Sequence, residues 1–158
     1  MSVGQDKAEI MSVTAAIVSR WNDASLDSSI CDLFRIHPSN PDYGSTPEDI
    51  ASKDLPRAQF MVEGDVPVEH TVGKTLREHM VTFQIWHSSS SNLEIALDLI
   101  ESTYDNSERA GTDPLSVSNG SVVRVQYSGR ESGPVNENVF LGSVEFEVEW
   151  QKDNSVPA

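Results

Sequence analysis

The sequence predicts an α+β domain with a mostly antiparallel sheet of about five strands and two main helices packed on one face. Two stretches repeat apolar residues at helical spacing, and five other stretches are rich in strand-forming residues. The expected order is helix, proline-rich loop, three strands, helix and two strands. Because this order lacks regular alternation of strands and helices, an antiparallel sheet is favoured over a parallel one.

A strand that leads directly into a helix is the centre of this predicted architecture. Residues 77–87 form the strand, and a run of serines at 88–91 interrupts it. Ser91 or Asn92 is expected to cap the helix that follows. The helix is predicted from a single apolar stripe, made by Leu93, Ala96, Leu97, Ile100 and Tyr104.

A first helix is predicted near the N-terminus, where apolar residues recur at helical spacing from Ile10 to Trp21. The spacing within Leu26 to Ile36 does not decide between a short helix and a strand. Residues 37–56 are expected to form a loop, because four prolines and Gly44 exclude a long regular element. A loop of this length within a compact domain suggests a role at an interface.

Three antiparallel strands are expected to form a meander before the central helix. Residues 58–63 are the first strand, and Gly64-Asp65 is expected to turn the chain. Residues 66–72 are the second strand, in which Pro67 suggests a sheet edge or a bulge. The strand at 77–87 is the third.

Two further strands are predicted after the central helix. The first covers residues 121–130, and residues 131–138 are expected to be a hairpin loop. The last strand covers residues 138–151, and residues 152–158 are expected to be a frayed tail.

The composition limits the possible classes of protein. A length of 158 residues suits one domain over residues 1–158, with a folded core at 8–151. No apolar run approaches the ~20 residues of a membrane span, and the first eight residues lack the features of a secretion signal. The single cysteine, Cys31, excludes an internal disulfide and a cysteine-based zinc site, which suits a reducing cytoplasm.

The charge of the chain is strongly negative. Its 25 acidic and 11 basic residues give a formal net charge of −14. This balance argues against binding nucleic acid by neutralising phosphates, which needs clustered lysine and arginine. It suits either simple solubility or a surface that must not adhere to a polyanion.

The sequence offers no catalytic, cofactor-binding or metal-binding site. His79 and His87 would lie ~26 Å apart on one strand and cannot share a metal, whereas His70 and His79 can meet across a hairpin. The fourth histidine, His37, lies in the proline-rich loop. None of the HExxH, CxxC, Walker, GxGxxG or GxSxG motifs occurs. We therefore expect a protein that is not an enzyme and carries no cofactor.

The last strand carries the only polar feature with a clear geometry. Glu145, Glu147 and Glu149 share one strand face at spacings of ~6.5–7 Å and form an acidic stripe. A solvated strand face explains the stripe, as does a repulsive or interface surface within an assembly. Glycoside cleavage would need a cleft with flanking aromatic residues, and a divalent metal usually takes ligands clustered in a loop.

Several of these elements together resemble a known family. An N-terminal helix and a proline-rich stretch precede Ala-Gln-Phe-Met-Val-Glu-Gly at 58–64. Val-Thr-Phe-Gln-Ile-Trp at 81–86 then leads into Leu-Glu-Ile-Ala-Leu-Asp-Leu-Ile at 93–100, and an acidic strand closes the chain. Over residues 8–151, this pattern is similar to the tail terminator (tail completion) proteins of long-tailed bacteriophages. The family has no signature motif from which site residues could be transferred.

The resemblance implies a structural virion protein that forms a ring, usually of six subunits, on the end of the tail tube. The ring would end tail growth and form the joint to the head. The implied partners are other copies of the chain, the tail tube protein and the head connector or stopper protein. DNA would pass through without specific binding, and no membrane is involved. The implied location is the virion tail, after assembly in the host cytoplasm.

Ring formation requires one surface patch to contact a different patch on the neighbouring copy. The edge strand near Val66 and the proline-rich loop would supply such patches, and the acidic stripe would lie on or near the lumen. The loop residues expected to make these contacts are Pro38, Pro41, Tyr43 and Pro47.

Three alternative functions stay open. The first is another head–tail joining or neck protein of the same particle. The second is a small acidic hydrolase or ligand-binding α+β domain, which predicts a deep pocket with converging polar groups. The third is a generic acidic bacterial adaptor.

Overall fold

The structure is a computed structural model that describes residues 2–35, 55–71, 74–105, 115, 117 and 120–153. Its eight elements, in chain order, are α1 (Ser2–Asp23), α2 (Leu26–Ser29), β1 (Leu33–Arg35), β2 (Arg57–Thr71), β3 (Lys74–His87), α3 (Ser90–Tyr104), β4 (Gly120–Asn136) and β5 (Val139–Asp153). No helix in this described part is long and apolar enough to cross a membrane.

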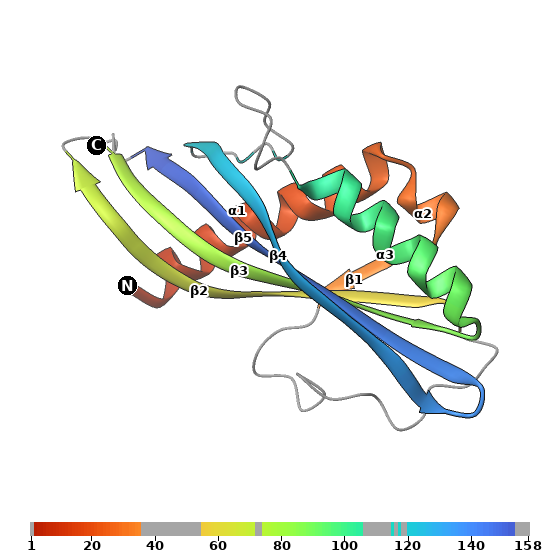
Figure 1. The fold of residues 1–158 in the computed structure, drawn as a ribbon. Coiled ribbons are helices and arrows are strands. Elements are labelled where there is room, and N and C mark those ends of the chain that lie inside the picture. The colour runs from red at the N-terminus through yellow and green to blue at the C-terminus, as the bar shows by residue number, and fades with distance from the viewer. Residues whose placement is uncertain are drawn as a thin grey trace.

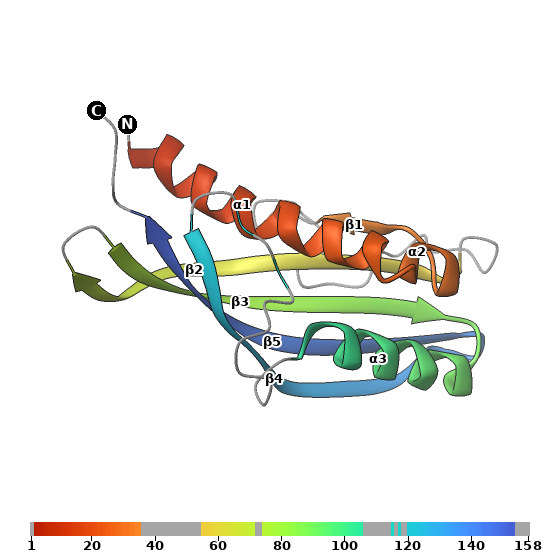
Figure 2. The same ribbon diagram turned by 90° about the horizontal axis from the view of Figure 1, so that it is seen from above.

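The five strands form one sheet in the order β1-β2-β3-β5-β4. The short strand β1 runs parallel to β2, and every other neighbouring pair is antiparallel. Figures 1 and 2 show α1 and α3 lying on the same face of the twisted sheet. The predicted fold class is therefore confirmed.

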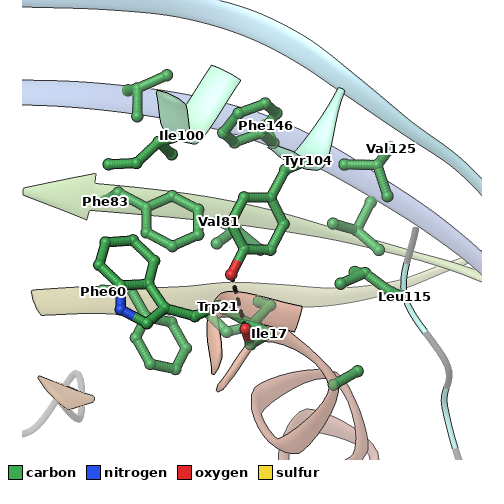
Figure 3. Close-up of a cluster of buried hydrophobic side chains, with 14 of the residues drawn as sticks. Ile17, Trp21, Phe60, Val81, Phe83, Ile100, Tyr104, Leu115, Val125 and Phe146 are labelled. Atoms are coloured by element: carbon green, nitrogen blue, oxygen red, sulfur yellow. Dashed lines mark hydrogen bonds between the residues drawn. The ribbon is translucent and has the colours of Figure 1, made fainter. Parts of the chain in front are cut away.

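The hydrophobic core lies between this face and the two helices. Phe83 of β3 is at its centre, with ring centroids 6.1 Å from Trp21 of α1 and 4.9 Å from Tyr104 of α3. The Tyr104 hydroxyl donates a 2.7 Å hydrogen bond to the carbonyl of Ile17 and so ties α3 to α1 (Figure 3). Burial raises the pKa of Tyr104, so this hydroxyl stays protonated and can act as the donor.

Helix α3 packs closely on β5 because Gly142 has no side chain. A Cβ atom at Gly142 would lie 2.8 Å from Leu97 Cδ1 and 3.0 Å from Leu93 Cδ1. Both leucines are almost completely buried. The apolar stripe predicted for this helix is confirmed, since all five of its residues are buried.

The start of α3 differs from the prediction. Its N-cap is Ser89, whose hydroxyl accepts a hydrogen bond from the backbone N–H of Asn92 at 3.3 Å. Ser89 has extended backbone geometry, whereas Ser91 and Asn92 are already helical, so neither can be the cap. The prediction of Ser91 or Asn92 was wrong by two or three residues.

The predicted meander is also corrected. Gly64-Asp65 does not turn the chain, because β2 runs unbroken from Arg57 to Thr71. The register between β2 and β3 instead shifts between Glu63 and Val66, with Gly64 at φ 74°. This is a β-bulge, in which glycine adopts a positive φ without steric cost.

Two further boundaries were wrong. Strand β4 continues to Asn136, so the hairpin turn is only Glu137-Asn138 instead of residues 131–138. Strand β5 continues to Asp153, two residues into the predicted tail. The undecided stretch from Leu26 to Ile36 contains both candidates, the short helix α2 and the strand β1.

Candidate functional site

The face of the sheet opposite the helices carries the candidate site. Side chains alternate between the two faces along each strand, and the strand register aligns them in rows across the sheet. Five glutamates lie on this face toward one end of the sheet, and we call them the acidic face: Glu63, Glu78, Glu145, Glu147 and Glu149. The three predicted glutamates therefore have two acidic neighbours on other strands.

The sequence analysis missed two of these five residues. Glu63 pairs with Met80, which in turn pairs with Glu147, and Glu78 pairs directly with Glu149. The alternation in β3 contained the signal for Glu78, because it lies on the same strand face as Thr82 and Gln84. The alternation of residues 58–63 contained the same signal for Glu63, which lies on the face opposite Phe60 and Val62.

The acidic face is at least partly open to solvent, and the described residues place little positive charge beside it. Glu63 and Glu145 are exposed, while Glu147 and Glu149 are half-buried. Among the described residues, the ion pair of this face joins Arg124 Nη2 to Glu149 Oε1 at 2.6 Å. Like charges directly opposite each other, as at Glu78 and Glu149, are unfavourable without such a partner. Arg124 therefore offsets the repulsion between Glu78 and Glu149, and the other carboxylates of the acidic face have no ion pair with a described residue.

The carboxylates of the acidic face do not converge. Within the described residues, no three histidine, cysteine, aspartate or glutamate side chains are arranged to hold a metal ion. Carboxylates that project in parallel from a sheet create a negative potential but do not enclose a ligand. The chemistry of this surface is repulsion of anions.

Toward the other end of the same face, the middle strands β2 and β3 carry buried side chains. Trp86 and Gln59 are fully buried and Met61 is 4% exposed, although none of them faces the helices. The Gln59 amide donates a 2.9 Å hydrogen bond to Gln84 Oε1 across the β2–β3 pair. These buried residues separate the acidic face from the rest of this side of the sheet.

The histidines form no site in the described residues. His79 lies on the helix-side face and is 1% exposed, with Nε2 accepting a 2.9 Å hydrogen bond from Trp150 Nε1 and Nδ1 donating to the Gly64 carbonyl. His70 pairs with Thr75 in the β2–β3 ladder, so the predicted meeting of His70 and His79 was wrong. His37 lies outside the described residues.

His87 lies near a shallow groove between α2 and α3. Its Nδ1 accepts a 3.3 Å hydrogen bond from the Ser89 backbone N–H, and burial lowers its pKa, so the ring is neutral near pH 7. The groove measures about 290 Å³ and is lined mainly by apolar residues, among them the exposed Ile95. It lacks the converging polar groups of a catalytic pocket.

The predicted contact residues of the proline-rich loop are not placed. The loop residues Pro38, Pro41, Tyr43 and Pro47 lie outside the described part of the chain. The predicted edge near Val66 fits the described backbone, in which this part of β2 pairs only with β3, while β1 pairs with Ala58 to Phe60.

No protein-family model matches the chain, and no curated protein matches it. The fold does match a solved structure, a chain of the "Virion of native gene transfer agent (GTA) particle". The TM-score is 0.57 at 12% sequence identity, and the match covers 87% of this chain and 92% of that chain. The two chains thus share a fold over nearly their full lengths.

Proposed function

We propose that this protein is a non-enzymatic structural component of a phage-like particle, and that it caps the end of the tail tube as a ring. In this role it ends tail growth and forms the joint to the head. The fold shared with a chain of a gene transfer agent virion is the observation that carries this proposal. The similarity of the sequence pattern to tail terminator proteins supports the finer role.

The surface chemistry supports a structural role over a small hydrolase. A catalytic or ligand-binding domain needs a deep pocket with converging polar groups. The grooves formed by the described residues, of about 290 to 480 Å³, are open and contain no such constellation.

The acidic face supports the proposed place of DNA. A negative surface repels the phosphate backbone, so DNA can slide past it without binding. We therefore assign Glu145, Glu147 and Glu149 to the lumen of the ring or its vicinity. A structure of the assembled ring with these residues on the outer rim would contradict this assignment.

Tail length tests the role directly. In particles assembled without this protein, we expect tail tubes of irregular, excessive length and heads without attached tails, and adding the purified protein restores uniform tails. Electron microscopy of negatively stained lysates measures both. Tails of normal length that fail to join heads would instead favour the alternative of a head–tail joining protein.

A mass measurement tests the ring. The purified protein, alone and mixed with tail tubes, is expected to form a closed oligomer in at least the mixture, measured by light scattering and by electron microscopy of tube ends. A chain that stays monomeric and does not associate with the tubes would contradict the proposal.

A further inference from the structure

The first edge of the sheet carries an exposed aromatic residue beside a groove. Phe34 of β1 is 55% exposed and lines a groove of about 400 Å³ together with Cys31, Pro56 and Arg57. We call these four residues the β1 patch. Arg57 has no ion-pair partner among the described residues, although the exposed Asp32 also lines this groove. The patch therefore combines a large apolar side chain with an available cation.

The opposite edge of the sheet has complementary chemistry. Val135 of β4 is 41% exposed and lines a groove of about 480 Å³ with Pro134, Leu141 and Glu131. We call these four residues the hairpin patch, because they lie near the β4–β5 turn. The Glu131 side chain is exposed and has no ion-pair partner in the described part of the chain. This patch combines apolar side chains with an available carboxylate.

The two patches lie at the two opposite edges of one sheet. β1 and β4 are the terminal strands in the order β1-β2-β3-β5-β4, and in the half of Figure 2 that contains α3 and the β4–β5 turn, β2 and β4 lie on opposite sides of the sheet. Phe34 pairs with Gln59, and Glu131 pairs with Ser143 at the other end of the same cross-strand row. One copy therefore presents both halves of a complementary contact without being able to join them to each other.

We propose that the β1 patch of one copy binds the hairpin patch of the next copy. Phe34 packs against Val135 and its apolar neighbours, and Arg57 pairs with Glu131. Because the two patches differ, the contact is head-to-tail and can close into a ring. The directional contact follows from the patches themselves, and only its closure into a ring rests on the proposed function.

Complementary blocking variants test the contact. Phe34→Glu disables the β1 patch and Val135→Glu disables the hairpin patch, so neither variant alone is expected to assemble. An equimolar mixture retains one intact patch of each kind, and it is expected to form dimers and nothing larger. Light scattering, alone and with tail tubes, measures the masses, and circular dichroism confirms that each variant is folded.

Ile95→Glu is the matched control. Ile95 is 58% exposed, comparable to Phe34, but it lies on α3, on the helix side of the sheet, and lines neither the groove of the β1 patch nor that of the hairpin patch. This variant is expected to assemble as the unaltered chain does. Loss of assembly in Ile95→Glu would overturn the assignment, because it would place a contact on α3.

A charge exchange provides an independent test. Arg57→Glu and Glu131→Arg are each expected to weaken assembly at least tenfold, and combining them in one chain is expected to restore much of the loss. Glu131 is exposed and Arg57 is half-buried, so circular dichroism is used again to confirm that each variant is folded. Assembly that is insensitive to all of these variants would overturn the proposed contact while leaving the ring intact as a hypothesis.

Two other results have separate meanings. If Phe34→Glu prevents assembly and Val135→Glu does not, the contact is not head-to-tail between these patches and the inference is wrong. If the unaltered chain never assembles, even with tail tubes, both the contact and the proposed ring are wrong.

Discussion

His79 shows how one buried polar residue joins three parts of the structure. Its ring lies between Gly64 of the β2 bulge and Trp150 of β5, and it makes one hydrogen bond to each. A neutral ring with the proton on Nδ1 satisfies both bonds, because Nε2 is then free to accept from the Trp150 indole. The residue therefore secures the bulge and the indole at the same time.

Replacing His79 by leucine should destabilise the fold by about 1–3 kcal/mol, because it leaves the buried Trp150 N–H without an acceptor and removes the hydrogen bond to the Gly64 carbonyl. Urea denaturation, monitored by tryptophan fluorescence, measures the free energy of unfolding. The control is His87→Leu on the same strand, where one long hydrogen bond to Ser89 is lost and less than about 1 kcal/mol is expected. Equal losses at both positions would contradict the bridging role of His79.

This role could not be predicted from the sequence. The alternation of β3 places His79 on the face of Val81 and Phe83, which was visible in the residue pattern. The carbonyl that accepts the hydrogen bond from His79 is in reach only because of the bulge at Gly64. The sequence does not predict this bulge, because a glycine followed by aspartate is also a common turn signal. Only the pairing of β2 with β3 decides between a turn and a bulge, and pairing is a long-range property.

Among the elements, the long helices and strands were predicted best. The stripe of α3 and the alternation of β5 are strong because one face of each is buried along its whole length. Register shifts limit such reasoning. Strict alternation would place Val122 beside Arg124, but the shift between them turns Val122 into the core, where it is 4% exposed.

The start of α3 gives a test at the scale of the element. Ser89→Ala removes the N-cap and should cost about 1 kcal/mol of stability. Ser91→Ala, two residues away in the same serine run, removes a side chain that caps no backbone N–H, and it should cost less than about 0.5 kcal/mol. Thermal unfolding of both variants measures the difference. A larger loss of stability for Ser91→Ala than for Ser89→Ala would mean that Ser91 is the N-cap, as the sequence predicted.

For the molecule as a whole, the sheet separates two kinds of surface. One face is covered by α1 and α3 and supplies the core (Figure 3), while the acidic end of the other face stays open. The acidic stripe could be predicted from one strand, but its extension across the sheet to Glu63 and Glu78 required the strand order. The β1 patch could not be predicted, because the sequence pattern did not decide between a helix and a strand there. The hairpin patch could not be predicted as part of a sheet edge, because residues 131–138 were expected to be a loop instead of the end of β4.

The acidic face is expected to prevent the protein from binding DNA. Glu145→Lys combined with Glu147→Lys reverses two charges on the proposed lumen, and it spares Glu149, whose loss would break the pair with Arg124. We expect this variant to bind duplex DNA at about 50 mM salt. Its affinity should fall steeply as the salt concentration rises, because such binding releases counterions. Fluorescence anisotropy with labelled DNA measures the affinity, and the unaltered protein should show none.

Asp23→Lys combined with Asp27→Lys is the matched control for this variant. It changes the net charge by the same amount, but both residues are exposed in the helical layer, at the end of α1 and the start of α2. If repulsion depends on the acidic face, the control should bind DNA far more weakly than the lumen variant. Equal binding by the two variants would mean that only the total charge matters, and the assignment of the acidic face to the lumen would then lose its physical basis.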